Sequence, residues 1–284
     1  MNHTTSPTLA QALAQAHTLG LARIDAQLLL LHAVGCPDAG RAWLLAHDTE
    51  AMDDTVHAQF IALCQRRLAG EPVAYLTGRK EFYGLPLQVD ARVLDPRPDT
   101  ETLVDWALEV IAPLASPRVV DLGTGSGAIA LALQSQRTDA QVLAVDASTD
   151  ALAVAQANAE RLGLPVQFQS ANWLAGVEGP FDAIVSNPPY IPSADPHLAA
   201  LTHEPLQALA SGADGLEDIR TIVAQAPAHL QPGGWLLLEH GYDQAEAVQA
   251  LLATQGFALV QSRNDLAGIA RCSGGQWPLA QTVK

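Results

Sequence analysis

Hydrophobic positions indicate helices in the first part of the chain. Two stretches carry apolar residues at helical spacing, namely Leu21, Ile24, Leu28 and Leu31, and then Val56, Phe60, Leu63 and Leu68. Gly35 and Gly70 stand where these helices should stop. Residues 1–72 hold no cluster of catalytic residue types. We therefore expect them to form a helical bundle with a packing or recognition role.

The pattern changes over residues 73–98. Aromatic residues, Gly84 and several prolines in this stretch predict a β-hairpin linker. Asp99 or Thr100 is then expected to cap a helix through "TETLVDWALEVIAPL".

Short apolar runs alternate with helical stretches over residues 99–284. The expected strands are 118–122, 141–146, 166–169, 181–186, 235–239, 257–261 and 268–271. Helical patterns lie between several of them, best seen in "TDALAVAQANAERLGL" and "QAEAVQALLATQG". Alternating strands and helices predict an α/β domain with a doubly wound, mostly parallel sheet.

Composition and charge narrow the class of protein. Of the 284 residues, 49% are hydrophobic and 16% charged, which is typical of a globular chain. The net charge of −15 makes nucleic acid a poor main partner. Cys36, Cys64 and Cys272 have no metal-like spacing, and they indicate reduced thiols in the cytoplasm. We expect no metal site, no signal peptide and no membrane span.

A glycine loop follows the first expected strand of the sheet, in "RVVDLGTGSGAIALAL". Glycines 123, 125 and 127 allow a tight turn and a close approach of a ligand to the backbone. Asp146, at the end of the next strand, is placed to accept hydrogen bonds from ribose hydroxyls. The loop also fits the pattern of dinucleotide-binding proteins through Ala128, so NAD remains an alternative, as does a tight turn without a ligand.

Two features favour S-adenosylmethionine over NAD. Asp121 directly precedes the loop, where a carboxylate would repel a pyrophosphate but attract a sulfonium or an ammonium group. After the third strand, Asn172 is a hydrogen-bond partner for an adenine edge, and Trp173 offers an aromatic face for stacking. Trp173 as a core or lid aromatic is the competing interpretation.

The sequence "NPPY" follows the fourth expected strand as Asn187, Pro188, Pro189 and Tyr190. Consecutive prolines stiffen the backbone, because both fix φ and neither donates an N–H. The Asn187 side-chain oxygen and the Pro188 carbonyl are therefore two rigid acceptors that can hold both N–H bonds of a planar nitrogen. Tyr190 can stack on the flat group, so that positioning makes a poor nucleophile reactive. A plain strand-terminating turn explains the prolines but not the flanking Asn and Tyr.

The chain resembles the HemK/PrmC family of peptide chain release factor glutamine methyltransferases. The resemblance rests on "DLGTGSGAIALAL", "AVDAS", "QSANW", "IVSNPPYIP" and "LLLEHG" in that order, together with "PRPDTE" and the helical N-terminus. It implies a class I S-adenosylmethionine-dependent methyltransferase fold: a Rossmann-like seven-stranded sheet in the order 3-2-1-4-5-7-6, with the seventh strand antiparallel. It covers essentially the whole chain.

The resemblance also implies roles for individual residues. The cofactor loop falls on Gly123, Thr124, Gly125, Ser126 and Gly127, the ribose carboxylate on Asp146, the adenine neighbour on Trp173, and the amide clamp on Asn187 to Tyr190. The implied reaction is methylation of the glutamine side-chain nitrogen in the Gly-Gly-Gln loop of release factors, with residues 1–72 recognising the protein substrate and 99–284 catalytic. A monomer is expected. The alternatives are a glutamine of a ribosomal protein, an exocyclic base amine, an NAD-dependent oxidoreductase and a binding module without catalysis.

Some positions depart from the family pattern, and others have roles that the sequence leaves open. Asn172 replaces a usual Asp, and the C-terminal "IARCSGGQWPLAQTVK" is atypical, including a Gly-Gly-Gln of its own that we interpret as coincidence. Arg97 is expected either to meet a carboxylate of cofactor or substrate or to cap a turn. His240 and Phe82 are expected to be packing residues rather than site residues.

Overall fold

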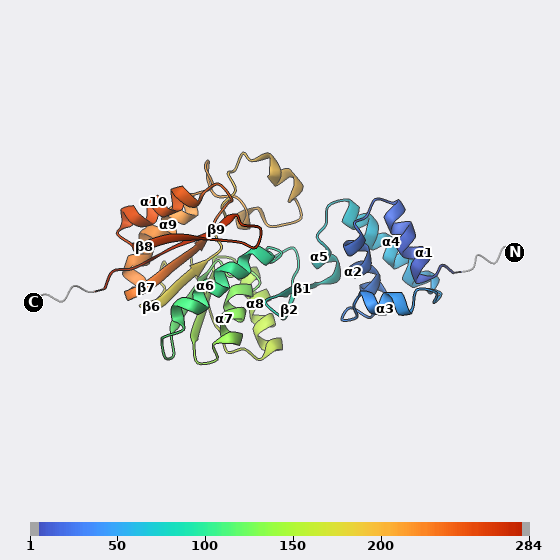
Figure 1. Cartoon of the computed structure of the whole chain (residues 1–284), viewed down its shortest axis with the longest axis horizontal. Coiled ribbons are helices and arrows are strands. Elements are labelled where there is room, and N and C mark those ends of the chain that lie inside the picture. Colours follow the sequence, from blue (N-terminus) through green and yellow to red (C-terminus); the bar gives the residue numbers. More distant parts are fainter. Residues whose placement is uncertain (1–5, 280–284) are drawn as a thin grey trace, which may run out of the picture. The chain divides into compact units, whose positions relative to one another are not determined.

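The computed structural model describes residues 6–279. The chain divides into two compact units, Met1–Arg79 and Lys80–Lys284, which we call the helical unit and the sheet unit. The ribbon in Figure 1 shows helices alone in the first unit up to Thr77 and a helix-flanked sheet in the second. Among the described residues, no helix is long and apolar enough to cross a membrane, and no group of three or more His, Cys, Asp or Glu is arranged to hold a metal ion.

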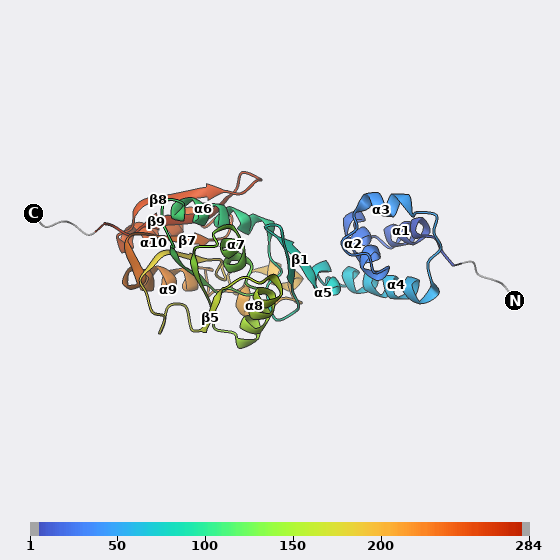
Figure 2. The same ribbon diagram turned by 90° about the horizontal axis from the view of Figure 1, so that it is seen from below.

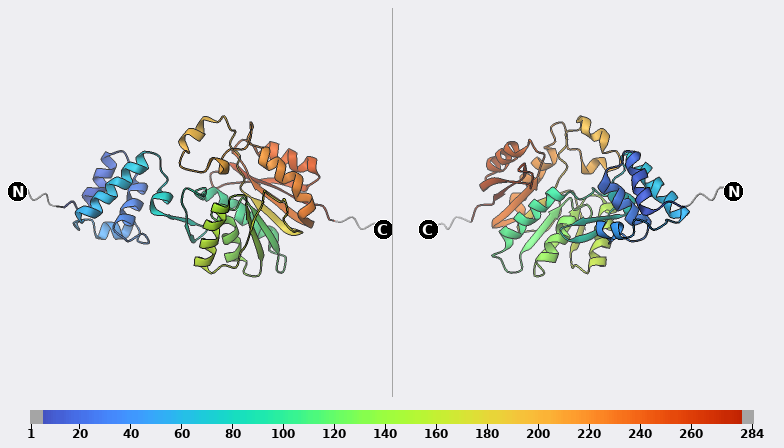
Figure 3. Two further views of the ribbon diagram at one scale, coloured as in Figure 1. Left: turned by 180° about the vertical axis from the view of Figure 1, so that it is seen from behind. Right: turned by 45° about the vertical axis from the view of Figure 1, so that its right-hand side comes forward.

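The helical unit contains five helices within the described residues. They are α1 (Leu9–Thr18), α2 (Arg23–Ala33), α3 (Arg41–Ala46), α4 (Asp54–Leu68) and α5 (Val73–Thr77), seen from two sides in Figure 3. A capping box starts α1: the Thr8 hydroxyl accepts from the backbone N–H of Gln11, and the Gln11 side-chain oxygen accepts from the backbone N–H of Thr8. Asp53 caps α4 by accepting from the Thr55 N–H at 2.8 Å.

The apolar face expected for α2 is partly wrong. Leu31 is buried as expected, but Ile24 is 66% exposed and Leu28 is 45% exposed, and the helix instead buries Leu29 and Leu30. Four consecutive leucines allow several phases of a 3.6-residue period, so the pattern alone does not fix the inward face. On α4, Phe60 and Leu63 are buried as expected, whereas Leu68 at the end of the helix is exposed.

The stretch expected to be a β-hairpin linker is a mixture of elements. It begins with α5, which ends at Gly78 in the left-handed conformation. The hairpin itself is confined to β1 (Arg79–Phe82) and β2 (Leu85–Gln88), and the short 3-10 helix η1 (Pro98–Thr100) follows it. Pro72 before α5 has the fixed φ that suits a helix start, which the prediction of a hairpin overlooked.

The sheet unit is built on a seven-stranded sheet. Its strands are β3 (Arg118–Leu122), β4 (Gln141–Asp146), β5 (Gln167–Ser170), β6 (Phe181–Ser186), β7 (Leu230–Glu239), β8 (Ala258–Asn264) and β9 (Ala270–Gln276). The order is β5-β4-β3-β6-β7-β9-β8, with β9 antiparallel to both neighbours and the other pairs parallel. Counted within the sheet, this is the expected order 3-2-1-4-5-7-6.

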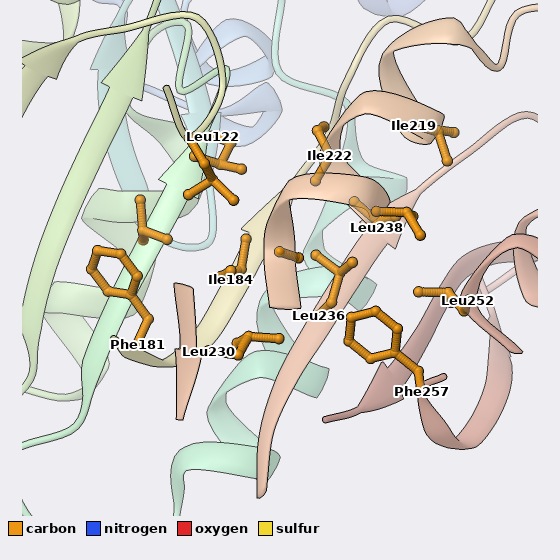
Figure 4. Packing of buried hydrophobic residues seen from close by; sticks show 14 of the residues in the cluster. Leu122, Phe181, Ile184, Ile219, Ile222, Leu230, Leu236, Leu238, Leu252 and Phe257 are labelled. Carbon is orange, nitrogen blue, oxygen red and sulfur yellow. The ribbon is translucent and has the colours of Figure 1, made fainter. Parts of the chain in front are cut away.

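Helices cover both faces of this sheet, as Figures 1 and 2 show. One layer holds α6 (Glu101–Ile111), α7 (Ala128–Gln136) and α8 (Thr149–Leu162), and the other holds α9 (Glu217–Gln225) and α10 (Ala245–Gln255). Leu122, Ile184 and Leu236 of the sheet pack against Ile222 of α9 and Leu252 of α10 (Figure 4). Such fully buried strands explain the continuous apolar runs of the sequence.

The Gly-Gly-Gln near the C-terminus lies inside the sheet. Gly274 and Gly275 are buried in β9, where Gly274 is paired with Leu237 of β7. A side chain at Gly274 would collide with the Leu237 side chain and the Trp106 ring, so close packing explains this glycine. The motif is therefore a structural part of the strand and not a substrate segment.

Candidate active site

The glycine loop connects β3 to α7 through residues 123–127. Gly123, Gly125 and Gly127 all have positive φ values, of 69°, 55° and 84°. A Cβ atom on Gly127 would lie 3.0 Å from the Leu131 side chain and 3.2 Å from the Ala155 side chain, so the loop can sit tightly between α7 and α8 only with glycine there. The turn therefore exposes backbone at the carboxyl ends of the strands, as expected.

Asp146 at the end of β4 holds this loop in place. One of its carboxylate oxygens accepts from the Gly125 N–H at 2.9 Å, and the other accepts from the Ser148 N–H at 2.8 Å. Each oxygen has a further lone pair, so the carboxylate can still receive hydroxyl groups of a ligand. Asp146 both shapes the loop and faces the cavity next to it.

Asp121 lies beneath the loop and is completely buried. Its Oδ2 accepts from the Thr124 hydroxyl at 2.6 Å and from the Ala130 N–H at 3.2 Å, while Oδ1 has no hydrogen-bond partner. Burial raises the pKa of Asp121 to about 7, partly opposed by these hydrogen bonds. The side chains of Thr124 and Ser126 are also buried, and none of these three residues lines the cavity.

Trp173 lies across the loop from β3. Its indole N–H donates to Asp218 at 3.2 Å, and its ring is 3.3 Å from the position that a Cβ atom on Gly123 would take. Trp173 has a positive φ of 52°, which is a strained backbone conformation for a bulky residue. Asn172 beside it is exposed. The structure thus places the indole at the cavity wall, where the sequence predicted an adenine neighbour.

A cavity of about 450 Å³ opens among these elements, within the size range of small-molecule sites. The predicted residues that line it are Gly123, Gly125, Asp146, Asn172, Trp173, Asn187 and Pro189. Sequence reasoning missed others, including Arg92, Leu94, Ser148, Pro205, Gln207 and Asp218. Those from the segment after "NPPY" carry no motif, and only the folded chain brings them to the strand ends.

The charges of this cavity suit a cationic ligand better than a pyrophosphate. Asp146 and Asp218 line it, and Arg92, the basic residue that lines it among the described residues, is paired with Asp90 at 2.6 Å. Paired charges attract an anion weakly, whereas unpaired carboxylates favour a sulfonium and an ammonium group. Asp121, predicted to face the cofactor, does not line this cavity and adds nothing to its charge in direct contact with a ligand. The residues present therefore fit S-adenosylmethionine.

The "NPPY" segment begins where β6 ends. The Ser186 hydroxyl donates to the Leu122 carbonyl at 2.7 Å, which joins the ends of β6 and β3. Both prolines are buried, while Asn187 and Tyr190 are half-buried. The Tyr190 carbonyl accepts from the Gln244 side chain at 3.0 Å, and burial, with the nearby Glu239 carboxylate, raises the Tyr190 pKa to about 12. Tyr190 is therefore a neutral ring that is held by its backbone.

A second, smaller cavity of about 110 Å³ adjoins the same segment. Its lining is mostly apolar and includes Leu94, Arg97, Asn187, Tyr190, Ile191 and Leu209. Asn187 lines both cavities. Asn187 therefore stands at the junction between a cavity large enough for a nucleoside and a smaller one with room for a small planar group.

Arg97 forms ion pairs within the chain. Its guanidinium contacts Glu204 at 2.5 Å and Asp95 at 3.3 Å, and Glu204 is almost completely buried. Glu204 belongs to the segment between "NPPY" and α9, so this pair holds that segment against the residues before α6. The prediction that Arg97 meets a cofactor or substrate carboxylate stays untested, because both partners in the structure are protein carboxylates.

Two further residues behave as packing residues. His240 is fully buried, with Nδ1 2.8 Å from the Gly241 carbonyl and Nε2 2.7 Å from the Ser273 hydroxyl. Burial lowers its pKa, which favours the neutral ring. Phe82 is buried at the end of β1. Neither residue lines the two cavities described above.

Two polar residues next to Asn187 escaped the sequence analysis. Thr100 is the N-cap residue of α6, one of the two expected caps, but its side chain makes no cap hydrogen bond. The Thr100 hydroxyl instead accepts from the Asn187 side-chain amide at 3.2 Å. Glu239, at the end of β7, is 1% exposed and its pKa is raised to about 7, mainly by burial. The charged residue that ends the apolar run "LLLE" was the available signal.

The sheet order, the glycine loop and the cavity at the strand ends define a class I S-adenosylmethionine-dependent methyltransferase fold. Residues 100–212 match the family model "Methyltransferase small domain", and residues 8–78 match the "PrmC N-terminal domain". A methyltransferase from Pyrococcus furiosus aligns with a TM-score of 0.53 and 20% identity, over 76% of this chain and 98% of that one. A T. thermophilus 16S rRNA methyltransferase in complex with AdoMet and guanosine aligns with a TM-score of 0.53 and 20% identity, over 70% of this chain and 49% of that one.

Full-length relatives define the particular family. The release factor glutamine methyltransferase of Burkholderia pseudomallei is 49% identical, over 97% of this chain and 99% of its own length. That of Xylella fastidiosa is 48% identical, over 94% and 98%, and that of Bordetella pertussis is 49% identical, over 90% and 95%. The chain belongs to the release factor glutamine methyltransferase family.

Proposed function

We propose that this chain methylates the side-chain amide nitrogen of the glutamine in the Gly-Gly-Gln motif of a peptide chain release factor. The observation that carries the proposal is the position of Asn187, which lines both the large and the small cavity. A residue at this junction can hold an acceptor nitrogen next to a methyl donor. The names of the full-length relatives support the same substrate.

S-adenosylmethionine is the proposed cofactor in the larger cavity. When it is bound, it supplies an electrophilic methyl group on a sulfonium centre. Asp146 would hold the ribose hydroxyls, Trp173 would stack on the adenine, and the amides of the glycine loop would contact the amino-acid portion. The carboxylates of the lining support a positively charged ligand.

Asn187 and Pro188 would act on the substrate amide. A carboxamide nitrogen is a poor nucleophile because its lone pair is delocalised into the carbonyl. Two acceptors, the Asn187 Oδ1 and the Pro188 carbonyl, would hold its two N–H bonds and aim the lone pair, while Tyr190 stacks on the planar group. No base is needed before transfer, because the methylated nitrogen is acidic and then releases its proton to water.

A protein substrate suits this chain better than a nucleic acid. The net charge of −15 opposes a phosphate backbone, and the small cavity at Asn187 is mainly apolar. Cys36, Cys64 and Cys272 are free thiols, which supports action in a reducing compartment. We propose that the enzyme acts in the cytoplasm, and that the helical unit contributes to recognition of the release factor.

Mass spectrometry of a release-factor fragment tests the proposal. After incubation with S-adenosylmethionine, the glutamine of the Gly-Gly-Gln peptide should gain one methyl group. Asn187→Ala should lower this rate by at least about 100-fold, as loss of a positioning contact does, while the matched variant Asn264→Ala, at an exposed site on β8, should keep it. Methyl transfer to RNA or to a ribosomal protein, with none to the fragment, would replace this function by one of the alternatives.

A further inference from the structure

Two buried polar side chains adjoin Asn187 without lining either cavity. Thr100 ends η1 and is 4% exposed, and Glu239 ends β7 and is 1% exposed. The parallel register pairs Ser186 of β6 with Leu238 of β7, which brings the next residues, Asn187 and Glu239, side by side. Nothing in the methyl-transfer step derived above uses Thr100 or Glu239.

The hydrogens of this group can be assigned from the chemistry of its members. A carboxylate only accepts hydrogen bonds, and a hydroxyl has one hydrogen to donate. The Thr100 hydroxyl and the Asn187 amide both favour the charged form of Glu239. The Thr100 oxygen accepts from the Asn187 Nδ2 at 3.2 Å. A hydroxyl can favour a carboxylate only by donating to it, so we assign the Thr100 hydrogen to Glu239. The nitrogen edge of the Asn187 amide thus faces Thr100 and Glu239, and its oxygen edge is left free.

We propose that Glu239 and Thr100 are positioning residues that fix the orientation of the Asn187 amide and so present its oxygen to the substrate nitrogen. The inference rests on the proposed function, since a substrate carboxamide offers N–H donors. An amide turned by 180° would place its own N–H groups against those donors, and the acceptor on which the reaction depends would be lost. Neither positioning residue needs to touch the substrate.

The charge state of Glu239 sets this orientation. Arg271 of β9 favours the carboxylate, whereas burial and Asp99 of η1 oppose it. Tyr190 and Cys272, the partner of Glu239 across β7 and β9, are further titratable groups that face it. A protonated Glu239 would donate to the Thr100 oxygen and free the Thr100 hydrogen for the Asn187 oxygen. The productive orientation of the Asn187 amide is therefore the one that the charged Glu239 carboxylate imposes. The rate of methyl transfer should rise as Glu239 ionises near pH 7.

Four variants test the inference on the full chain. Glu239→Gln and Thr100→Val should each lower kcat for the release-factor fragment about 10-fold or more, with KM and the affinity for S-adenosylhomocysteine changed less than about threefold. Thr100→Ser keeps the hydroxyl and should retain wild-type kcat. Glu109→Gln removes an exposed carboxylate that pairs with Arg263 and is the charge control. Glu239→Gln should also lose the rise of kcat near pH 7.

Several outcomes would overturn the inference. Wild-type kcat in Thr100→Val, or an unchanged pH profile in Glu239→Gln, contradicts it. An equal loss in Thr100→Val and Thr100→Ser, accompanied by lower thermal stability, assigns Thr100 a structural role only. If Glu239→Gln does not fold, the kcat of Thr100→Val compared with that of Thr100→Ser decides whether the hydroxyl positions Asn187.

A spectroscopic readout separates this inference from the proposed function. The side-chain ¹⁵N–¹H signals of Asn187, assigned by their absence in Asn187→Ala, should titrate near pH 7 in the wild type and not in Glu239→Gln. This result would hold even if no release-factor fragment were methylated, in which case only the proposed substrate fails. If these signals do not change with pH in the wild type, the charge state of Glu239 does not set the orientation of the Asn187 amide, and the inference is refuted.

Discussion

Asn187 shows how much of a residue's chemistry is decided by its neighbours. The prolines after it fix the backbone, Ser186 before it ties the strand end to β3, and Thr100 takes up its amide nitrogen. What remains is a single oxygen at the junction of two cavities. A side chain that would be unremarkable on a flexible loop becomes a directed acceptor here.

Trp173 allows a test at the same scale. Trp173→Ala should weaken binding of S-adenosylhomocysteine by about 1–3 kcal/mol, because the stacking surface for adenine is removed. Trp173→Phe is the matched control, since it keeps an aromatic face while it loses the hydrogen bond to Asp218 and part of the ring area. Isothermal titration calorimetry measures both. Equal affinity in the wild type and the alanine variant would show that the indole is a packing residue.

Site residues could be predicted from the sequence where their signal is local. The roles of "NPPY" and Asp146 could be predicted from their positions at strand ends. Asp146, Asn187 and Pro189 do line the large cavity. Asp121 was expected to meet the cofactor, but the fold buries it beneath the loop with Thr124 and Ala130 as partners. Glu239 and Thr100 are far from Asn187 in the sequence, so only the strand register and the packing of η1 reveal them.

At the scale of elements, the strands were easier to predict than the helix faces. The ranges of β3, β4 and β6 agree with the structure, because buried parallel strands give continuous apolar runs bounded by polar residues or glycine. The start of β7 was missed, since Pro232, Gly233 and Gly234 indicate a turn and yet lie in the strand. The inward face of α2 depends on contacts with the other helices, which no local pattern contains.

The turn before α9 supports the active-site segment and can be tested. Gly215 has a φ of 75°, and a side chain there would collide with the Tyr190 carbonyl and the Gln244 amide. Gly163 at the end of α8 has a similar φ of 67° but open space around it.

The two alanine variants should therefore differ. Gly163→Ala should lower the free energy of unfolding by about 1 kcal/mol, the conformational penalty alone. Gly215→Ala should lower the free energy of unfolding by roughly 1–3 kcal/mol more than this, because the new side chain overpacks the turn. It should also lower kcat, because Tyr190 is displaced. Chemical denaturation and steady-state kinetics give both quantities. Identical behaviour of the two variants would mean that the contact with Tyr190 carries no strain.

At the scale of the whole molecule, buried carboxylates link stability to pH. Burial raises the pKa of Asp121 from 3.8 and that of Glu239 from 4.5, each to about 7. Their contribution to stability is full at low pH and is lost as pH rises from about 4 to about 7, because in this range the carboxyls ionise in the unfolded chain but stay protonated in the folded one. His240, whose pKa is lowered by burial, acts in the opposite direction.

A comparison of variants isolates one of these groups. Asp121→Asn cannot ionise, so its free energy of unfolding relative to that of the wild type should increase as pH rises from about 4 to about 7 and then stay constant. Urea denaturation of both proteins across this range measures the difference, in which the contribution of His240 cancels. A difference that stays constant with pH would show that Asp121 is already charged in the folded protein at acidic pH.

The central claim is that Asn187 and Pro188 hold a glutamine amide between the two cavities. A crystal structure of the chain with S-adenosylhomocysteine and a Gly-Gly-Gln peptide tests it most directly. The account predicts the glutamine side chain in the small cavity, its nitrogen within hydrogen-bonding distance of the Asn187 Oδ1 and the Pro188 carbonyl, and the cofactor sulfur on the side of the large cavity. A glutamine bound elsewhere, or residues 187–190 turned away from the sulfur, would contradict the account.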